Sequence, residues 1–469
     1  MFRIVMVISM HKNIRYLAYI VLACLAFLVI YIGFIPLYIS HVQSQSKNGK
    51  AAWLNDPRLL KKMQEKQAGS IYDRRGELLA QTVTGPAGVN KRQYPMGHNF
   101  AHIIGYSSTK YGLTGIEAGL SSVLLGEGNL ELSNRSKGNS IELTIDASLQ
   151  KLAVSLLGGR RGALVAIEPK TGDILALASS PTFDPNEIDT QMPSLKNDNS
   201  SPLLNRATQG AYAPGSVFKL VTLTSVLQNI PGAANRVFEC KGSLSGQGFV
   251  LKCNDVHGRI DLKKALEVSC NSVFAALGLE LGSRALVKTA QVYGFNRNYY
   301  LPINYYSGEV SGNGSMNESE LAFTGIGQGK AVANPMQMAI VACGLANNGM
   351  VMRPTLVKRI ISPKGETIQE SKPEEWLNVT DSERAETIKD YMVAVVREGS
   401  GTRAGISGIE VAGKTGTAEN SDRAHAWFVG FAPASNPEVA VAVIIENGGS
   451  GGAVAAPVAR EIMSRAIDM

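Results

Sequence analysis

A run of residues without charged side chains lies near the start of the chain. Residues 16–41 contain no charged side chain, and residues 17–35 are almost wholly apolar. About 20 such residues cross a bilayer as one helix. A buried helix of a globular domain would show a polar face, and a cleaved signal peptide would have a shorter apolar core followed by small residues. The pattern therefore predicts a short tail and an uncleaved transmembrane anchor within residues 1–40.

After this run, hydrophobic and polar positions alternate over short segments. The segment AGSIYDRRGELLAQ (68–81) predicts two short strands joined by a tight turn at residues 73–76. Residues 139–146 alternate as a strand does, and residues 147–157 have the spacing of an amphipathic helix. We interpret residues 41–158 as a small α+β pedestal domain, of a type that serves for dimerisation.

A different pattern begins at residue 159. The segment GALVAIEPKTGDILALAS (162–179) predicts a β-hairpin, residues 183–210 a polar loop, and several stretches between 216 and 350 helices. Strand-like runs return near the end, as IEVAGKTGTAEN, AHAWFVGFAP and EVAVAVIIENG. An early hairpin, late strands and helices between them predict one sheet built from both ends of an α/β domain, residues 159–469.

Composition and charge restrict the possible functions. The chain has 469 residues, too many for one ordinary core, and a net charge of +7. The positive residues are spread along the chain without a dense basic tract. This distribution favours mild attraction to an anionic membrane or cell-wall polymer, and it argues against a nucleic-acid partner.

The cysteines suggest no cofactor. Cys24 and Cys343 lie in apolar stretches and are interpreted as packing residues. Cys240 and Cys253 bracket a loop, and they could form a disulfide or remain two free thiols. Because no Cys-x-x-Cys pair is present, the sequence predicts no zinc site and no other metal.

Ser-x-x-Lys is a weak signal by itself. It occurs five times, at Ser9/Lys12, Ser44/Lys47, Ser107/Lys110, Ser148/Lys151 and Ser216/Lys219. In the last pair, Pro214-Gly215 introduces a predicted helix that places Ser216 at its start and Lys219 one turn later. A serine hydroxyl needs an adjacent base to become a nucleophile. A lysine can be that base if burial or a second cation destabilises its ammonium form.

Two further motifs follow Ser216 in order. Ser269-Cys270-Asn271 leads into another predicted helix, and Lys414-Thr415-Gly416-Thr417 lies on a predicted strand. A second Lys-Thr-Gly triplet at 170–172 precedes Ser216 and lies in the predicted hairpin turn. We therefore interpret the triplet at 170–172 as turn chemistry and the one at 414–416 as part of a site.

These three motifs, in this order, resemble those of penicillin-binding proteins and serine β-lactamases. The wider sequence is similar to class B, monofunctional penicillin-binding proteins in GALVAIEPKTGDILALASSPTFDPN, GIGQGKAVANPMQMA (325–339) and VAGKTGTAEN followed by HAWFVGFAP. AGSIYDRRGELLA is also similar, although the family commonly has Arg where this chain has Ala68. The resemblance covers nearly everything after residue 40. It implies a transpeptidase domain with an antiparallel sheet flanked by helices, preceded in the sequence by a membrane anchor and a pedestal domain.

The resemblance also implies a role for each motif residue. Ser216 would attack the carbonyl between the last two D-alanines of a peptidoglycan stem peptide, with Lys219 as base. Ser269 would relay a proton, Asn271 would bind the peptide amide, and the backbone N–H groups of Ser216 and Thr417 would form an oxyanion hole. The negatively charged end of the substrate would be bound on the predicted strand, by Lys414, Thr415, Gly416 and Thr417.

The acyl-enzyme would then be attacked by an amine of a neighbouring stem, giving a crosslink without a cofactor. The alternatives are a membrane-anchored serine β-lactamase, a β-lactam sensor and a non-catalytic scaffold. Glu374, in Glu374-Glu375-Trp376-Leu377-Asn378, resembles the deacylating glutamate of class A β-lactamases, but its surroundings suggest a charged surface linker. About 120 residues between anchor and hairpin are too few for a glycosyltransferase domain. The resemblance therefore implies a membrane partner of the SEDS type and a catalytic domain outside the cell membrane.

Overall fold

The computed structural model of the chain describes residues 19, 65–85, 88–126, 137–297, 299–311 and 314–469. No helix within these ranges is long and apolar enough to cross a membrane. The predicted anchor at 17–35 lies outside the described residues, apart from Tyr19.

The first part of the described chain is built on a six-stranded sheet, in the order β17-β16-β6-β1-β2-β3. Its strands are β1 (Ile71–Tyr72), β2 (Leu78–Thr84), β3 (Asn90–Gln93), β6 (Ser140–Leu143), β16 (Val357–Ile361) and β17 (Thr367–Glu370). The predicted tight turn between β1 and β2 is confirmed. Asp73 Oδ1 accepts hydrogen bonds from the backbone N–H groups of Arg75 and Glu77, at 2.8 and 2.7 Å. Asp73 Oδ2 accepts a third, from the backbone N–H of Ala147, so the turn is tied to the start of α7 (Ala147–Leu157).

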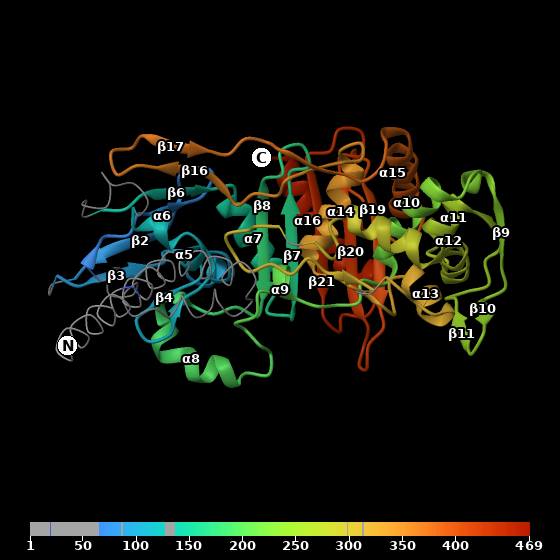
Figure 1. Cartoon of the computed structure of the whole chain (residues 1–469), viewed down its shortest axis with the longest axis horizontal. Helices are drawn as coiled ribbons and strands as arrows, with labels where there is room; N and C mark the ends of the chain where they lie inside the picture. The colour runs from blue at the N-terminus through green and yellow to red at the C-terminus, as the bar shows by residue number, and fades with distance from the viewer. Residues whose placement is uncertain (1–18, 20–64, 86–87, 127–136, 298, 312–313) are drawn as a thin grey trace, which may run out of the picture. The chain divides into compact units, whose positions relative to one another are not determined.

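Strands β16 and β17 reach this sheet from far along the chain. Strand β16 pairs antiparallel with β6, and β17 pairs with β16 (Figure 1). The hairpin therefore joins the sheet of the first part to the polypeptide that follows residue 159. Short elements complete this part: α4 (Ala101–Ile104), β4 (Ser107–Ser108), β5 (Gly112–Leu113), α5 (Gly115–Gly119) and α6 (Ser121–Leu124).

The second sheet is assembled from both ends of the following region, as the sequence predicts. Five antiparallel strands lie in the order β19-β20-β21-β7-β8. In Figure 1 the green hairpin therefore lies beside the red strands. The bounds are β7 (Gly162–Ile167), β8 (Ile174–Ser180), β19 (Ala412–Ala418), β20 (His425–Ala432) and β21 (Val439–Ile445). The Lys170-Thr171-Gly172 triplet forms the turn between β7 and β8, where Gly172 has φ +81°.

Helices cover both faces of this sheet. The amphipathic helix α7 (Ala147–Leu157) and α16 (Gly451–Ile467) pack on one face, where Leu149, Phe428 and Ile462 belong to one buried cluster. Helix α14 (Pro335–Ala346) packs against β7, β20 and β21 and is buried along its whole length. Burial of apolar surface at about 25 cal/mol per Å² makes this layered core the main source of stability.

The segment between the hairpin and the last strands is mostly helical and carries the candidate site. Besides α14, its helices are α8 (Ile188–Asn197), α9 (Arg206–Gln209), α10 (Lys219–Asn229), α11 (Leu262–Glu267), α12 (Asn271–Val292), α13 (Glu318–Gly325) and α15 (Ser382–Arg397). Two ribbons lie between α10 and α11: β9 (Val237–Cys240) with β12 (Gly258–Asp261), and β10 (Ser243–Gly246) with β11 (Phe249–Lys252). Two further pairs are β13 (Glu309–Val310) with β14 (Ala331–Val332), and β15 (Met350–Met352) with β18 (Glu375–Asn378).

Candidate active site

Ser216 lies on a tight turn that leads into a helix. A 3₁₀ turn spans Gly215–Phe218, and α10 begins at Lys219. Gly215 has φ +57°, a left-handed conformation that suits glycine, and its N–H donates to the carbonyl of Gly327 at 2.8 Å. Ser216 is half-buried in the turn that precedes α10, while Lys219 is fully buried.

The turn packs directly against the strand that carries the third motif. A Cβ atom added to Gly215 would come within 3.1 Å of Ala418, and one added to Gly416 would come within 3.1 Å of Val217 Cγ1. The Nε1–H of Trp427, on the neighbouring strand, donates to the carbonyl of Ala213 at 3.2 Å. Small residues at 215 and 416 thus let the turn of Ser216 lie against β19, which is the edge strand of the sheet.

The Ser-Cys-Asn motif forms the turn between α11 and α12. Ser269 has φ +57°, which is strained for a residue with a side chain and is common at functional sites. Cys270 is the N-cap of α12, and Asn271 is its first residue. Lys219 Nζ donates to the carbonyl of Ser269 at 2.7 Å, to Ser269 Oγ at 3.2 Å and to Asn271 Oδ1 at 2.7 Å.

Lys414 completes this network from β19. Its Nζ donates to Ser269 Oγ at 2.9 Å and to the carbonyl of Thr415 at 3.0 Å, and the side chain is fully buried. Thr415 Oγ1 lies 2.7 Å from Ser400 Oγ, and Thr417 is exposed. The hydroxyl of Ser269 therefore lies between two buried amines.

Burial lowers the pKa of both amines. It lowers the pKa of Lys219 to about 7, although the nearby thiols of Cys270 and Cys253 oppose the shift. Burial also lowers the pKa of Lys414 well below its usual range, and the neighbouring Lys219 cation lowers it further. A serine hydroxyl has one proton to donate and two lone pairs to accept with. With one of the two amines neutral, Ser269 can donate to it and accept from the other, which is the arrangement a proton relay needs.

The predicted site residues thus come together from three separate segments. The structure places Ser216 one turn before Lys219 and beside Gly416. Within the described ranges, the hydrogen bonds of Lys219 Nζ go to Ser269 and Asn271 and not to Ser216. Activation of Ser216 by Lys219, and the oxyanion hole of Ser216 and Thr417, stay predictions that follow from this placement.

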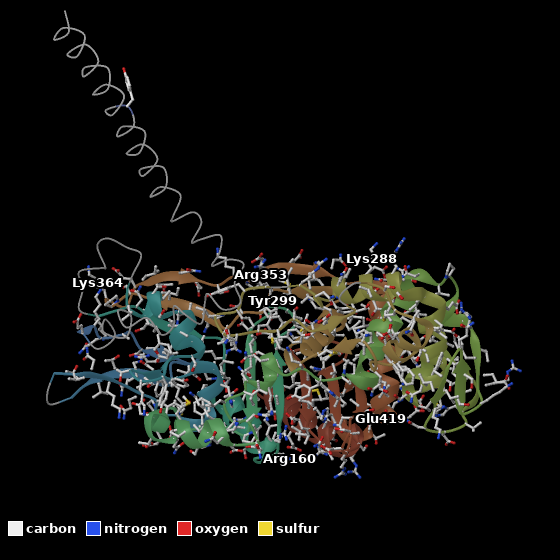
Figure 2. The ribbon with its side chains drawn as sticks, turned by 60° about the horizontal axis from the view of Figure 1, so that its bottom comes forward. Arg160, Lys288, Tyr299, Arg353, Lys364 and Glu419 are labelled. Atoms are coloured by element: carbon white, nitrogen blue, oxygen red, sulfur yellow. The ribbon has the colours of Figure 1, made fainter. Side chains whose placement is uncertain are left out.

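The competing sequence patterns have ordinary structural partners. Lys151, of the pair Ser148/Lys151, forms an ion pair with Glu77 at 3.0 Å. Glu374 forms an exposed ion pair with Arg353 at 2.9 Å. Figure 2 places Arg353 well apart from Glu419, which follows the Lys-Thr-Gly-Thr strand. Glu374 is thus a surface residue in this fold, which removes the one sequence feature that favoured a hydrolytic enzyme of class A type.

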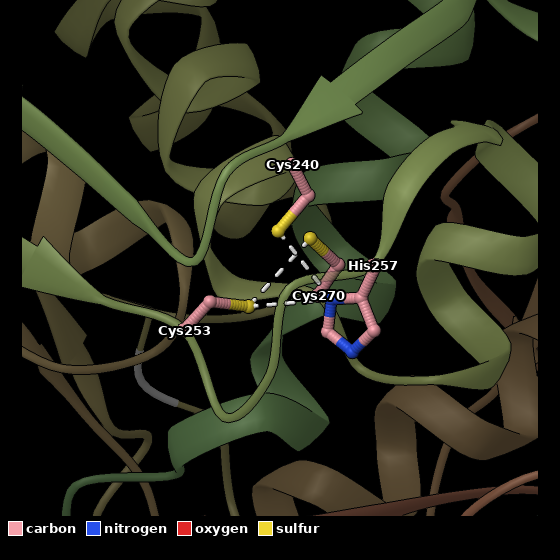
Figure 3. Close-up of side chains that lie close together, drawn as sticks. All are labelled: Cys240, Cys253, His257 and Cys270. Atoms are coloured by element: carbon pink, nitrogen blue, oxygen red, sulfur yellow. Dashed lines mark hydrogen bonds between the residues drawn. The ribbon is translucent and has the colours of Figure 1, made fainter.

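The cysteines form a feature that the sequence did not predict. All four described cysteines are free thiols, including Cys240 and Cys253. The sulfur atoms of Cys240 and Cys253 lie near Nδ1 of His257, and the sulfur of Cys270 lies near that of Cys253 (Figure 3). The sequence does show that cysteine and histidine are concentrated here, because three of the chain's five cysteines and one histidine fall within 240–270. That concentration could have predicted the cluster.

Comparison with known proteins indicates the same family that the three sequence motifs resemble. Residues 162–464 match the family model of the penicillin-binding protein transpeptidase domain. Residues 68–141 match that of the penicillin-binding protein A dimerisation domain. The chain is 32% identical to the peptidoglycan D,D-transpeptidase PbpA of Mycolicibacterium smegmatis, over 84% of this chain and 87% of the relative.

Solved structures agree with these matches. The penicillin G acyl-enzyme complex of penicillin-binding protein A from M. tuberculosis superposes with a TM-score of 0.79 at 30% identity, over 86% of this chain and 100% of that one. The D,D-transpeptidase domain of a peptidoglycan glycosyltransferase from Eggerthella lenta gives a TM-score of 0.80 at 32% identity, over 86% and 99%. The chain therefore belongs to the penicillin-binding protein transpeptidase family.

Proposed function

We propose that this protein is a peptidoglycan D,D-transpeptidase that crosslinks stem peptides through an acyl-enzyme on Ser216. The observation that carries the proposal is the hydroxyl of Ser269 held between the buried amines of Lys219 and Lys414, together with the packing of the Ser216 turn against β19, the strand that carries Lys414. Family membership and the named relatives support the reaction class, and the hydrogen-bond network supplies the groups that would transfer protons.

In the first step, neutral Lys219 accepts the proton of Ser216 Oγ while that oxygen attacks the carbonyl of the penultimate D-alanine. This step requires the amine to turn from Ser269 toward Ser216. The proton then passes through Ser269 to the amine of the leaving D-alanine. A second stem's amine attacks the acyl-enzyme and returns a proton by the same route, so the site ends as it began.

Lys414 and the edge of β19 hold the substrate. The terminal carboxylate of the stem peptide is a counter-ion for Lys414, and its arrival favours the proton on Lys414 over Lys219. The edge strand leaves backbone groups free to pair with an extended peptide, as in other cases of strand addition. Asn271, which already accepts from Lys219 at 2.7 Å, is placed to bind the peptide amide.

The protein would act outside the cell membrane, anchored by residues 17–35. The apolar run and the need to reach peptidoglycan support this location. A crosslinking enzyme needs polymerised glycan strands, so a glycosyltransferase of the SEDS type in the same membrane is the expected partner. β-Lactams acylate Ser216 because their strained amide takes the place of the scissile peptide bond.

Intact-mass analysis with benzylpenicillin tests the proposal. The full chain in detergent should gain one stable adduct, and Ser216→Ala should gain none. Ser148→Ala is the matched control, because Ser148 also begins a helix one turn before a lysine but lies on the surface. An adduct that turns over within seconds would favour the β-lactamase alternative, and no wild-type adduct would refute a catalytic role.

A further inference from the structure

Four potential metal ligands meet next to the Ser-Cys-Asn turn. Cys240 ends β9, Cys253 follows β11, His257 precedes β12, and Cys270 caps α12. Their ligand atoms all lie within 4.8 Å of one another. Cys240 and Cys270 are buried, and Cys253 and His257 are partly buried. Figure 3 shows the three sulfur atoms and the imidazole ring pointing toward a common centre.

The separations match the edges of a zinc tetrahedron. With Zn–S near 2.3 Å and Zn–N near 2.05 Å, ideal geometry gives S···S edges of about 3.8 Å and S···N edges of about 3.6 Å. Cys253 Sγ lies 3.7 Å from Cys270 Sγ. Cys240 Sγ and Cys253 Sγ each lie 3.5 Å from His257 Nδ1. Three of the six edges therefore lie within about 0.1 Å of these ideal lengths, and the other three are no longer than 4.8 Å.

We propose that Cys240, Cys253, His257 and Cys270 form a closed, structural Zn²⁺ site that holds the Ser-Cys-Asn turn in place. Three cysteines and one histidine are a common ligand set for tetrahedral structural zinc. With all four positions taken by protein, the ion has no open position for substrate or water. This inference concerns a second centre and goes beyond the proposed transpeptidase reaction.

The surroundings favour a metal over a disulfide. A disulfide requires sulfur atoms about 2.05 Å apart, and it would use two of the cysteines while leaving the imidazole without a function. The backbone N–H of Asn271 donates to Cys253 Sγ at 3.2 Å. Such a hydrogen bond supports a thiolate and orients it as a ligand.

The site is placed to act on the catalytic turn. Cys270 lies between Ser269, whose backbone is strained at φ +57°, and Asn271. Strained residues persist only where their surroundings hold them. Asn271 is also tied to the ribbon, since its side-chain N–H donates to the carbonyl of Lys252 at 3.2 Å. Zinc would join the two ribbons to the turn that presents Ser269 and Asn271 to Lys219.

Metal content tests the proposal directly. Full-length protein carrying no histidine tag, purified in detergent under reducing conditions, should contain about one zinc per chain by mass spectrometry. The double variant Cys240→Ser/Cys253→Ser should retain at least tenfold less zinc after challenge with a chelator. Cys343→Ala is the matched control, because Cys343 is a buried thiol on α14 outside the cluster, and it should keep its zinc.

A second measurement remains informative if the double variant fails to fold. Wild-type protein stripped of metal and reloaded with Co²⁺ should show thiolate-to-cobalt charge transfer and the visible bands of tetrahedral cobalt. The stripped protein should react with a fluorescent penicillin at least tenfold more slowly, and Zn²⁺ should restore the rate. Ser216→Ala should bind zinc normally, which separates this inference from the proposed reaction. Wild-type protein without zinc, a disulfide among these cysteines, or zinc unaffected by the double variant would each overturn the proposal.

Discussion

The pH dependence of acylation follows from the burial of Lys219. The base must be neutral to accept the proton of Ser216, and burial lowers the pKa of Lys219 to about 7. At that pKa the neutral fraction rises from about one tenth at pH 6 to about nine tenths at pH 8, so the acylation rate constant should rise roughly tenfold and then level off. An ordinary lysine would be neutral in only about one molecule in 3,000 at pH 7, a difference worth about 5 kcal/mol.

Replacing the amine separates its catalytic role from its effect on stability. Lys219→Met keeps the length of the side chain and removes the base, so acylation should fall by about 10²–10⁴-fold. Two effects on stability oppose each other: the variant no longer buries an amine, but it leaves the carbonyl of Ser269 and Oδ1 of Asn271 without their donor. The net change in stability should therefore be small compared with the loss of rate. The unfolded chain binds more protons than the native one between the native pKa, about 7, and the ordinary value of 10.5. Wild-type stability should therefore rise with pH through that window, and Lys219→Met should show a smaller rise.

The assay is the second-order rate constant for a fluorescent penicillin from pH 5.5 to 8.5, with thermal unfolding measured on the same samples. Lys151→Met is the control, since Lys151 follows a serine at the same spacing but forms a partly exposed ion pair with Glu77. A flat wild-type profile between pH 6 and 8, or a wild-type rate in Lys219→Met, would refute the assignment of Lys219 as base.

Three other substitutions probe the supports of the site. Ser269→Ala removes the hydroxyl that accepts from both amines. It should slow acylation at least a hundredfold in the same assay and lower the free energy of unfolding by about 1–3 kcal/mol. Gly327→Ala places a Cβ 2.0 Å from the carbonyl oxygen of Gly215, at a φ of +76°, so it should displace the turn of Ser216 and lower both acylation and the unfolding temperature. Glu446→Gln weakens a buried ion pair with Arg206 at 2.6 Å and should cost about 3–5 kcal/mol in denaturant unfolding. Burial by itself would raise the pKa of Glu446, but hydrogen bonds from Tyr212 and Arg206 hold it below the ordinary value. The stabilisation by this pair should therefore be complete above the ordinary pKa of 4.5 and be lost as the pH falls from there through the lower pKa of the folded protein. Unfolding curves with the same acid dependence in wild type and Glu446→Gln would contradict this reasoning.

Local patterns were sufficient to predict the second sheet and the motif positions. Continuous apolar runs in 162–179 and in the last strands, bounded by turn residues, indicate strands buried on both faces, and the order of segments leaves few ways to join them. Ser216, Asn271 and Lys414 lie at the predicted helix starts and strand. Proline, glycine and capping residues act within a few positions of themselves, so the sequence reveals them.

Contacts between distant segments could not be predicted in this way. The hairpin of β16 and β17 pairs with a sheet more than 200 residues earlier in the chain, and no periodicity reports such a partner. The thiols of Cys240, Cys253 and Cys270 meet His257 only because two ribbons and a helix start fold together. A search for Cys-x-x-Cys pairs therefore missed the cluster.

Release of D-alanine is the most direct test of the central claim, that Ser216 is the nucleophile of a transpeptidase. The full chain, supplied with uncrosslinked glycan strands whose stems end in D-alanyl-D-alanine, should release one D-alanine for each crosslink formed. Ser216→Ala should release none, and Ser148→Ala should match the wild type. Continued release by Ser216→Ala, or release by the wild type without any crosslinked product, would contradict the account.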